Sequence, residues 1–274
     1  MLRTEQMNKN ITWRTMRMIA LQSALTFAAV TAVGGAMLVH DEFKATANQK
    51  NQPVNSISVS EKAEKKKNKT INEKYAYSYQ GFNPKVIDTS VDISEILLNA
   101  DFCLPKKYSP NLASAISGSD VMLDSRVAPY YQAMYDAAKN DGIYLNPIAG
   151  YRSAEAQKEE FDELVDEYIA DEMSQANAVA EAARDVMIPL ASEHNAGLAV
   201  DICSHSASFE YTDEFEWLCN HAAEYGFILR YPKGEEKQKL TKVNFQPWHF
   251  RFVGIDAALE IESKSLTLEE YAAK

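Results

Sequence analysis

Cysteine is scarce in this chain, and basic residues are outnumbered by acidic ones. Only three of the 274 residues are cysteines, Cys103, Cys203 and Cys219, so at most one intramolecular disulfide can form. A disulfide framework is thereby excluded, and stability has to come from a packed core or a bound metal. The chain has 28 lysines and arginines against 39 aspartates and glutamates. Because no basic excess is available to neutralise phosphates, we expect no nucleic-acid partner.

Long hydrophobic runs are absent, with one exception near the N-terminus. Residues 18–39 carry no formal charge, and a helix of this length reaches about 33 Å, enough to cross the hydrocarbon layer of a bilayer. Four basic residues and one acid precede the run, so the positive-inside rule places the N-terminus in the cytoplasm. The alternative is a cleaved signal peptide, with Gly34 and Ala36 as small residues for processing.

These patterns predict the order of segments along the chain. A basic cytoplasmic tail covers 1–17, a transmembrane signal anchor covers 18–39, and a polar linker with too few hydrophobic residues for a core covers 40–80. A folded domain over 81–262 and a C-terminal tail over 263–274 follow. We therefore expect a single-pass protein of the cell membrane, attached through its N-terminal helix, with an extracytoplasmic domain.

Within the domain, hydrophobic periodicity predicts alternating helices and strands. Apolar residues at 3- and 4-residue spacing predict a helix over 128–140. The remaining predictions are helices over most of 152–187 and over 213–225, and strands over 143–149, 198–202, 227–231 and 250–253. The alternation is irregular and no Gly-x-Gly-x-x-Gly occurs, so the pattern favours a small α+β sheet domain over a doubly wound nucleotide-binding fold.

Two histidine-containing segments carry the chemistry. His194 precedes a glycine turn and Asp201 lies in the apolar strand that follows, so both side chains could reach one ion. His249 opens a second, strongly aromatic run; its alternative role is that of a hydrogen-bonded core histidine. Two histidines and an aspartate are the three ligands expected of a catalytic zinc, which keeps a fourth position for water or substrate. Such a zinc lowers the pKa of its water toward about 7 and polarises a scissile carbonyl.

The motifs resemble those of a known family. Ser192-x-His194-x-x-Gly197-x-Ala199-x-Asp201, followed by the run Pro-Trp-His-Phe-Arg-Phe-Val-Gly at 247–254, resembles the paired signature of the VanY-like D-alanyl-D-alanine carboxypeptidases, zinc peptidases that trim bacterial peptidoglycan stem peptides. Three further segments are similar to the family: Gly150-Tyr151-Arg152-Ser153-x-x-x-Gln157, residues 104–112 and residues 224–234. The resemblance covers roughly residues 95–256.

The resemblance implies a fold, a cofactor and a set of site residues. The fold is α+β, a small antiparallel sheet with flanking helices of the zinc D-Ala-D-Ala peptidase and hedgehog type, preceded by one transmembrane helix and a linker. The implied zinc (Zn2+) ligands are His194, Asp201 and His249. Arg152 is implied to steady the developing oxyanion or the substrate backbone, which suits a guanidinium physically. The other implied substrate-binding residues are Gln157, Ser192 and Trp248, although Trp248 could instead only pack beside His249.

The implied reaction is hydrolysis of the terminal D-Ala-D-Ala bond of a peptidoglycan stem peptide, by a protein that we expect to be a monomer. One catalytic position departs from the family. The family usually has a glutamate three residues before the last histidine, where it carries a proton from the zinc-bound water to the leaving amine; here that position is Gln246. An amide cannot carry this proton, and loss of a general base typically costs about 10²- to 10⁴-fold in rate.

Three explanations of Gln246 stay open: a zinc-binding relative with little activity, an enzyme that recruits another carboxylate, or a deliberate change. Glu193 is the obvious substitute, but neighbouring positions on an extended segment point to opposite faces, so we do not expect it beside the zinc with His194. Two rival hypotheses follow. The first is a zinc-dependent stem-peptide receptor without turnover, and the second is a peptidase for a different stem bond.

The other histidines, His40, His205 and His221, show no spacing that competes with the predicted zinc ligands. Cys203 stands two residues after Asp201 and so shares its strand face, where a thiol could approach a metal. We interpret Cys203 as a core residue or as the disulfide partner of Cys219.

Overall fold

The computed structural model describes residues 73–273. The predicted cytoplasmic tail, the anchor and most of the linker lie outside these described residues. Among residues 73–273, no helix is both long enough and apolar enough to cross a membrane.

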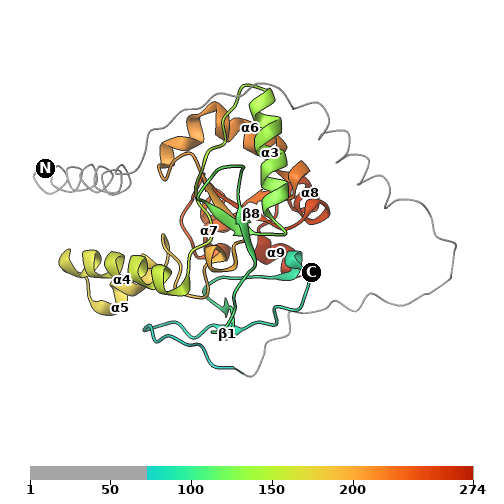
Figure 1. The fold of residues 1–274 in the computed structure, drawn as a ribbon. Helices are drawn as coiled ribbons and strands as arrows, with labels where there is room; N and C mark the ends of the chain where they lie inside the picture. The colour runs from blue at the N-terminus through green and yellow to red at the C-terminus, as the bar shows by residue number, and fades with distance from the viewer. Residues whose placement is uncertain (1–72, 274) are drawn as a thin grey trace, which may run out of the picture. The chain divides into compact units, whose positions relative to one another are not determined.

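A four-stranded antiparallel sheet forms the centre of the domain (Figure 1). Its strands, in spatial order, are β5 (Pro147–Ala149), β6 (Ala199–Ile202), β8 (His249–Phe252) and β7 (Phe227–Leu229). All three pairings are antiparallel. The predicted small antiparallel sheet is therefore confirmed, with each strand shorter than its predicted range or shifted by one residue.

The register of this sheet brings the predicted metal ligands together. Asp201 on β6 lies directly opposite His249 on β8, and Ala149 on β5 pairs with Asp201 from the other side. Directly opposed residues of an antiparallel pair point to the same face, with Cβ atoms about 4.5–5.5 Å apart. The neighbouring pair, Val200 and Phe250, therefore points to the opposite face, where both residues belong to the hydrophobic core.

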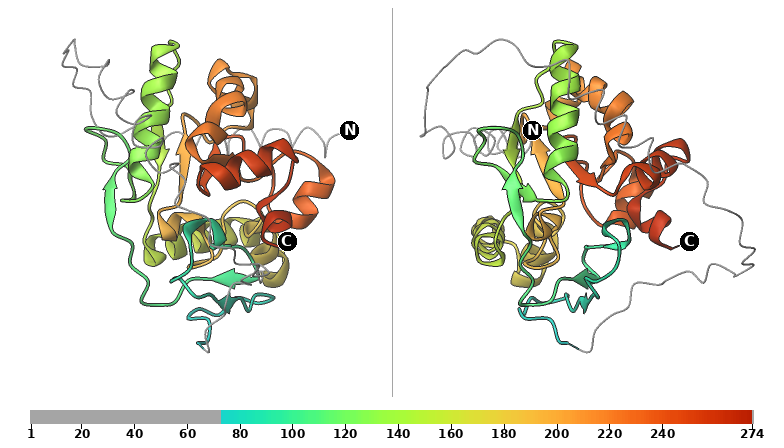
Figure 2. Two further views of the ribbon diagram at one scale, coloured as in Figure 1. Left: turned by 90° about the vertical axis from the view of Figure 1, so that its right-hand side faces the viewer. Right: turned by 45° about the vertical axis from the view of Figure 1, so that its right-hand side comes forward.

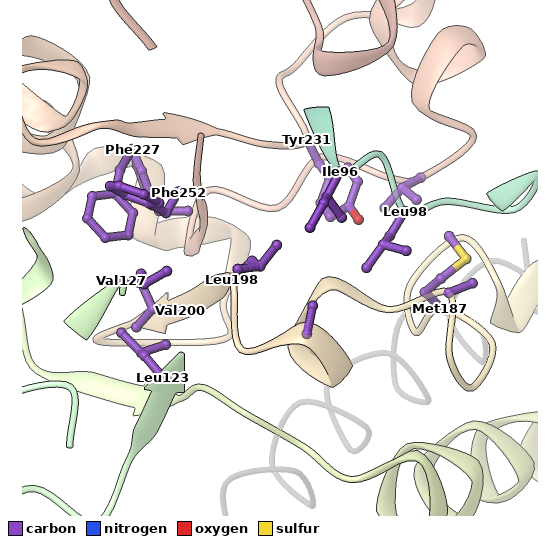
Figure 3. Close-up of a cluster of buried hydrophobic side chains, with 14 of the residues drawn as sticks. Ile96, Leu98, Leu123, Val127, Met187, Leu198, Val200, Phe227, Tyr231 and Phe252 are labelled. Atoms are coloured by element: carbon purple, nitrogen blue, oxygen red, sulfur yellow. The ribbon is translucent and has the colours of Figure 1, made fainter. Parts of the chain in front are cut away.

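The core on that face joins the sheet to the N-terminal half of the domain (Figure 3). Val200 and Leu198 lie between Leu123 and Val127 from one part of the chain and Ile96 from another. One face of the sheet is thus held by packing, which leaves the other face free to carry polar side chains.

Two small sheets flank the central one. Strands β1 (Lys85–Val86) and β2 (Phe102–Cys103) pair in parallel, and β3 (Leu112–Ser114) pairs antiparallel with β4 (Met122–Asp124). The sequence did not predict these strands, because two or three residues are too few to show alternation.

Helix α3 (Ala128–Asn140) has the predicted bounds. The predicted helical region after Arg152 is divided into α4 (Ala154–Ala170) and α5 (Gln175–Ala182), which pack beside each other on one side of the domain (Figures 1 and 2). The chain reverses between them at Glu172, which has a positive φ of 68°. The predicted helix over 213–225 is divided into α6 (Asp213–His221) and the 3-10 helix η4 (Ala222–Tyr225).

Three short helices were not predicted. They are α7 (Glu235–Thr241), α8 (Ile255–Ser263) and α9 (Leu268–Ala272). Helix α9 lies in the segment that the sequence assigned to a C-terminal tail, yet Leu268 is buried in a hydrophobic cluster with Val253 and Ile261. The helix is too short for periodicity to reveal it, although Thr267 and Glu270 form a capping box at its start.

The packed part of the chain also begins before Gly81. Tyr75 is buried, and its hydroxyl donates a hydrogen bond of 2.9 Å to the carbonyl oxygen of Pro189. The hydroxyl of Tyr79 donates to Asp162 on α4 at 2.8 Å. The end of the predicted linker is therefore fastened to the loop that leads into the histidine motif.

We expect Tyr75→Phe to lower the free energy of unfolding by about 1 kcal/mol, because it leaves the buried carbonyl of Pro189 without its donor. Urea unfolding of the wild type and the variant measures the difference. Tyr77→Phe is the matched control, since Tyr77 is only half-buried. Equal losses in the two variants would contradict a specific role for the Tyr75 hydroxyl.

Candidate metal centre

His194 is presented by a short 3-10 helix, η2 (Glu193–Ala196). The Ser192 hydroxyl caps its start by accepting from the backbone N–H of His194. Gly197 ends it with a φ of +67°, and a Cβ at this position would lie 2.7 Å from the backbone nitrogen of Asp124. Only glycine combines this conformation with this close approach, so the glycine of the motif serves to aim His194.

A second glycine fixes the orientation of the His194 ring. The Gly150 carbonyl oxygen lies 2.7 Å from Nδ1 of His194. A Cβ at Gly150 would lie 2.3 Å from the carbonyl oxygen of Met122. Any residue larger than glycine would therefore force the backbone at this position to move. Because Nδ1 donates to this carbonyl, Nε2 keeps its lone pair, and it lies 3.4 Å from Oδ2 of Asp201.

His249 is oriented in the opposite sense. Its Nε2 lies 3.3 Å from Oε2 of Glu193, and its Nδ1 lies 3.0 Å from Oδ1 of Asp201. In each histidine, the outer ring nitrogen, Nδ1 of His194 or Nε2 of His249, is thus paired with an oxygen acceptor. The inner nitrogen, Nε2 of His194 or Nδ1 of His249, faces the shared Asp201 carboxylate. Metal-binding histidines are held in this way in proteins.

The three predicted ligands converge in a buried site. One ligand atom from each of His194, Asp201 and His249 lies within 4.8 Å of the other two. The two imidazole rings are nearly perpendicular, with centroids 4.9 Å apart. Two imidazole nitrogens and a carboxylate oxygen match the donors and the count of a catalytic zinc site, so the residues present fit this ion.

The electrostatics of the site favour an ionised aspartate. Burial by itself would raise the pKa of Asp201, but its contacts with His194, His205 and His249 lower it well below its ordinary value. A carboxylate ligand has to be deprotonated to bind a metal. Asp201 therefore meets this requirement at neutral pH.

Glu193 has a role that the sequence did not reveal. Its segment is helical and not extended, so the alternation argument was wrong, and its carboxylate reaches His249. Its other oxygen, Oε1, accepts from Arg230 Nε at 2.7 Å and from Arg251 Nη1 at 2.8 Å. Burial would raise the pKa of Glu193, but the two guanidiniums hold it far below its usual value. A carboxylate held in this way is a poor proton acceptor, which makes Glu193 a support for His249 and not a replacement base.

Gln246 is buried beside the centre with its side-chain amide engaged. Its Nε2 donates 2.9 Å to the backbone carbonyl of Asp185, and its backbone N–H donates to the carbonyl of Tyr231. A carboxylate has no proton to donate to the Asp185 carbonyl at neutral pH. This environment therefore favours glutamine over glutamate at the position.

Arg152 lies at the start of α4, and its backbone N–H donates to the carbonyl of His194. Its Nη1 lies 3.1 Å from Gln157 Oε1 and 2.5 Å from Glu160 Oε2, and its side chain keeps 21% of its exposure. Gln157 is buried and also donates to the carbonyl of Met187 at 2.7 Å. A direct contact between Gln157 and a substrate would have to displace one of these bonds, whereas Arg152 retains free guanidinium surface.

Asn195 is a supporting residue that sequence reasoning missed. Its Nδ2 donates to the backbone carbonyls of Arg152 and Ser153, and its Oδ1 accepts from the backbone of Leu190. It therefore ties the arginine motif to the histidine motif. Its position directly after His194 was the available signal.

His205 lies in the loop after β6, and its contact with the predicted ligand Asp201 was not foreseen from the sequence. Its Nε2 lies 2.9 Å from Oδ2 of Asp201, and its ring has an edge contact with the half-buried Trp248. The chain turns back after β6 because Cys203 has a positive φ of 62°, which folds the following loop over Asp201. Trp248 therefore packs beside the centre through His205.

The thiols play no part in this arrangement. Cys203 donates its S–H to the carbonyl of Tyr144, and burial raises its pKa to about 11. Cys203 and Cys219 are both free, with Cys219 exposed, so the disulfide alternative was wrong.

This α+β domain, with two oriented histidines and an aspartate converging on one sheet face, has the architecture of a mononuclear metallopeptidase. A family model described as VanY, D-alanyl-D-alanine carboxypeptidase, matches residues 120–255. A D-alanyl-D-alanine carboxypeptidase of Enterococcus faecalis is 41% identical over 178 residues, which cover 65% of each chain, just under two thirds of that relative. The putative carboxypeptidase YodJ of Bacillus subtilis is 33% identical over 93% of this chain and 96% of its own. The chain belongs to the VanY family of D-alanyl-D-alanine carboxypeptidases.

Solved structures agree with this assignment. A glutamate-to-alanine mutant of a VanY D,D-pentapeptidase in complex with Zn(II) is 40% identical with a TM-score of 0.58, over 66% of this chain and 99% of that one. VanYB in complex with D-alanine-D-alanine is 41% identical with a TM-score of 0.59, over 66% and 98%. The LD-carboxypeptidase LdcB is 32% identical with a TM-score of 0.61, over 76% and 94%. The predicted fold class is thus confirmed for the described domain.

Proposed function

We propose that this protein is a membrane-anchored, extracytoplasmic zinc D,D-carboxypeptidase-like protein that acts on the terminal D-Ala-D-Ala bond of peptidoglycan stem peptides. The observation that carries the proposal is the convergence of three donor atoms on one buried point, with the outer nitrogen of each histidine already occupied. The apolar run over 18–39 supports the anchor, and the relatives support the substrate class.

In this proposal, zinc would be held by Nε2 of His194, a carboxylate oxygen of Asp201 and Nδ1 of His249. When bound, zinc supplies a water of lowered pKa and polarises the scissile carbonyl. Arg152 offers a partly exposed guanidinium to the developing negative charge or to the carboxylate end of the stem. Ser192 caps η2, the short helix that carries His194. Trp248 lies at the side of the site, where its ring contacts His205.

Two observations favour narrower alternatives. The first is the donor bond from Gln246 to Asp185, which stabilises a residue unable to carry a proton and so favours a zinc-dependent stem-peptide receptor with little turnover. The second is the likeness to LdcB, which favours action on the bond that remains after the terminal D-alanine has been removed.

A panel of stem peptides separates these possibilities. The full-length chain in detergent, loaded with zinc, is incubated with stems ending in D-Ala-D-Ala and with stems ending in a single D-Ala. We expect D-alanine release from the first stem, slow because of Gln246, and none from His249→Ala. Binding without any change in peptide mass would support the receptor, and release from only the shorter stem would support the second alternative. Neither binding nor release in the presence of bound zinc would overturn the proposal.

A further inference from the structure

Four charged side chains form a buried cluster against the His249 ring. Glu193, Arg230 and Arg251 have no exposed side-chain surface, and Glu269 keeps only 14%. The charges of two carboxylates and two guanidiniums cancel. Three of these residues lie in segments that the family motifs cover, but Glu269 comes from α9, in the segment predicted to be a tail.

The contacts run without a break from α9 to the metal centre. Glu269 accepts from Arg230 Nη1 at 3.0 Å and from Nη2 at 2.6 Å. The remaining nitrogen of the same guanidinium, Nε, donates to Oε1 of Glu193. The other oxygen of Glu193 faces Nε2 of His249. Each link is a charged or histidine side chain that is at least nine-tenths buried, apart from Glu269 itself.

The guanidinium nitrogens of Arg230 and Arg251 donate to two different carboxylates, those of Glu193 and Glu269. Oε1 of Glu193 already receives one donor from Arg230 and one from Arg251. Oε2 stays available for His249 because Glu269 takes both terminal nitrogens of Arg230. Without Glu269, the two terminal nitrogens of Arg230 lose their carboxylate acceptor. Glu193 is then the one carboxylate that remains bound to Arg230. Unpaired buried charges are costly, so Oε2 would turn toward Arg230 and leave His249.

Helix α9 is itself held firmly. Leu268 is buried, the Thr267–Glu270 capping box closes the helix start, and Lys237 binds Glu270. Asn99 donates to Oε1 of Glu269 at 3.2 Å, and both views of Figure 2 show the C-terminal helix beside the blue-green N-terminal part of the domain. Glu269 is therefore presented to Arg230 in a fixed position.

We propose that Glu269 is a positioning residue of the metal centre, which keeps Nε2 of His249 hydrogen-bonded to Glu193 and so keeps Nδ1 turned toward the metal. This inference rests on the zinc site of the proposed function and extends it to the C-terminal helix. Loss of partners that orient a ligand typically lowers metal affinity about 10- to 100-fold. Because Glu269 acts through two intermediate residues, we expect the lower end of this range.

The test compares Glu269→Gln with Glu270→Gln in the full-length chain in detergent. Both variants remove one negative charge from α9. Glutamine at position 270 keeps the acceptor of the capping box, because Glu and Gln both serve at this position, and Glu270 binds Lys237 and the Thr267 backbone and not Arg230. Zinc affinity is measured by competition with a chromophoric chelator, below the unfolding temperature of each variant. The absorption spectrum of bound Co2+ reports the geometry of the ligands independently of activity.

We expect Glu269→Gln to weaken zinc binding about 10-fold and to change the Co2+ spectrum, and Glu270→Gln to leave both unchanged. Equal affinities and spectra in Glu269→Gln and the wild type would overturn the inference and leave the proposed function standing. Equal weakening by the two variants would also overturn it, because the effect would then come from the stability of α9. A wild type that binds no zinc would overturn both proposals.

Discussion

Replacing Gln246 with glutamate is expected to raise the rate of D-alanine release from a D-Ala-D-Ala stem by about 10²- to 10⁴-fold, the usual contribution of a general base. The reason lies in the hydrogen-bond partner of the side chain. Gln246 donates to the carbonyl of Asp185, a bond that a carboxylate cannot make, so the introduced glutamate would be released from that carbonyl. A released carboxylate is attracted toward the metal centre three residues along the chain.

The measurement is single-turnover D-alanine release at equal zinc occupancy for the wild type, Gln246→Glu and Gln246→Ala. The alanine variant is the matched control, because it also removes the Asp185 bond but adds no base. We expect a gain from glutamate alone, and a new acidic limb in its pH–rate profile as the added carboxylate ionises. A wild type that already matches Gln246→Glu would mean that another group carries the proton.

The candidate metal centre was predictable from sequence because its three donor residues lie in local motifs. His194 and Asp201 are joined by one turn that requires Gly197, and the antiparallel sheet places Asp201 opposite His249. Periodicity also predicted α3 with its observed bounds, because four buried residues recur along its 13 positions. The long-range pairing of β6 with β8 could not be derived from composition. It was implied by the family resemblance, because the two motifs that contain these strands occur together as one paired signature.

The supporting residues were not predictable in the same way, because their partners are distant in sequence. Arg230 and Arg251 each lie within an apolar run, an unusual place for a charge, which was the one available signal that they are buried. Their acceptors, Glu193 and Glu269, are 37 and 39 residues from Arg230. Side-chain pairs at such separation follow from the folded packing, and no local pattern specifies them. The same limit explains why the contact between His205 and Asp201 was missed, since it depends on the positive φ of Cys203.

The buried charges also predict the largest effect on stability. We expect Glu193→Gln to lower the free energy of unfolding of the zinc-free protein at pH 7 by about 3–5 kcal/mol, the usual cost of removing one partner from a buried ion pair. The variant leaves Arg230 with Glu269 as its single carboxylate partner in the cluster, and it removes the carboxylate that pairs with Arg251, while both guanidiniums stay fully buried. Neither guanidinium can lose its charge at this pH to relieve the imbalance.

The pH dependence distinguishes this charge effect from a change in packing. The pKa of Glu193 in the folded protein is lowered from its ordinary value of 4.5. Its contribution to stability is therefore fully present above about pH 4.5 and is lost as the pH falls toward the lowered value. Urea unfolding in the presence of a chelator, at pH 7 and at pH 3.5, measures both quantities. The difference between Glu193→Gln and the wild type should shrink at the lower pH.

Glu163→Gln on the exposed face of α4 is the matched control, and we expect it to change the free energy of unfolding by less than about 0.5 kcal/mol. If Glu193→Gln behaved like this control at pH 7, the buried cluster would contribute nothing to stability. If it lost the same free energy at both pH values, the cause would be altered packing, because a packing effect does not depend on whether Glu193 binds a proton in the unfolded chain. A loss that is large at pH 7 and smaller at pH 3.5 is the result that only the ion pairs of Glu193 explain.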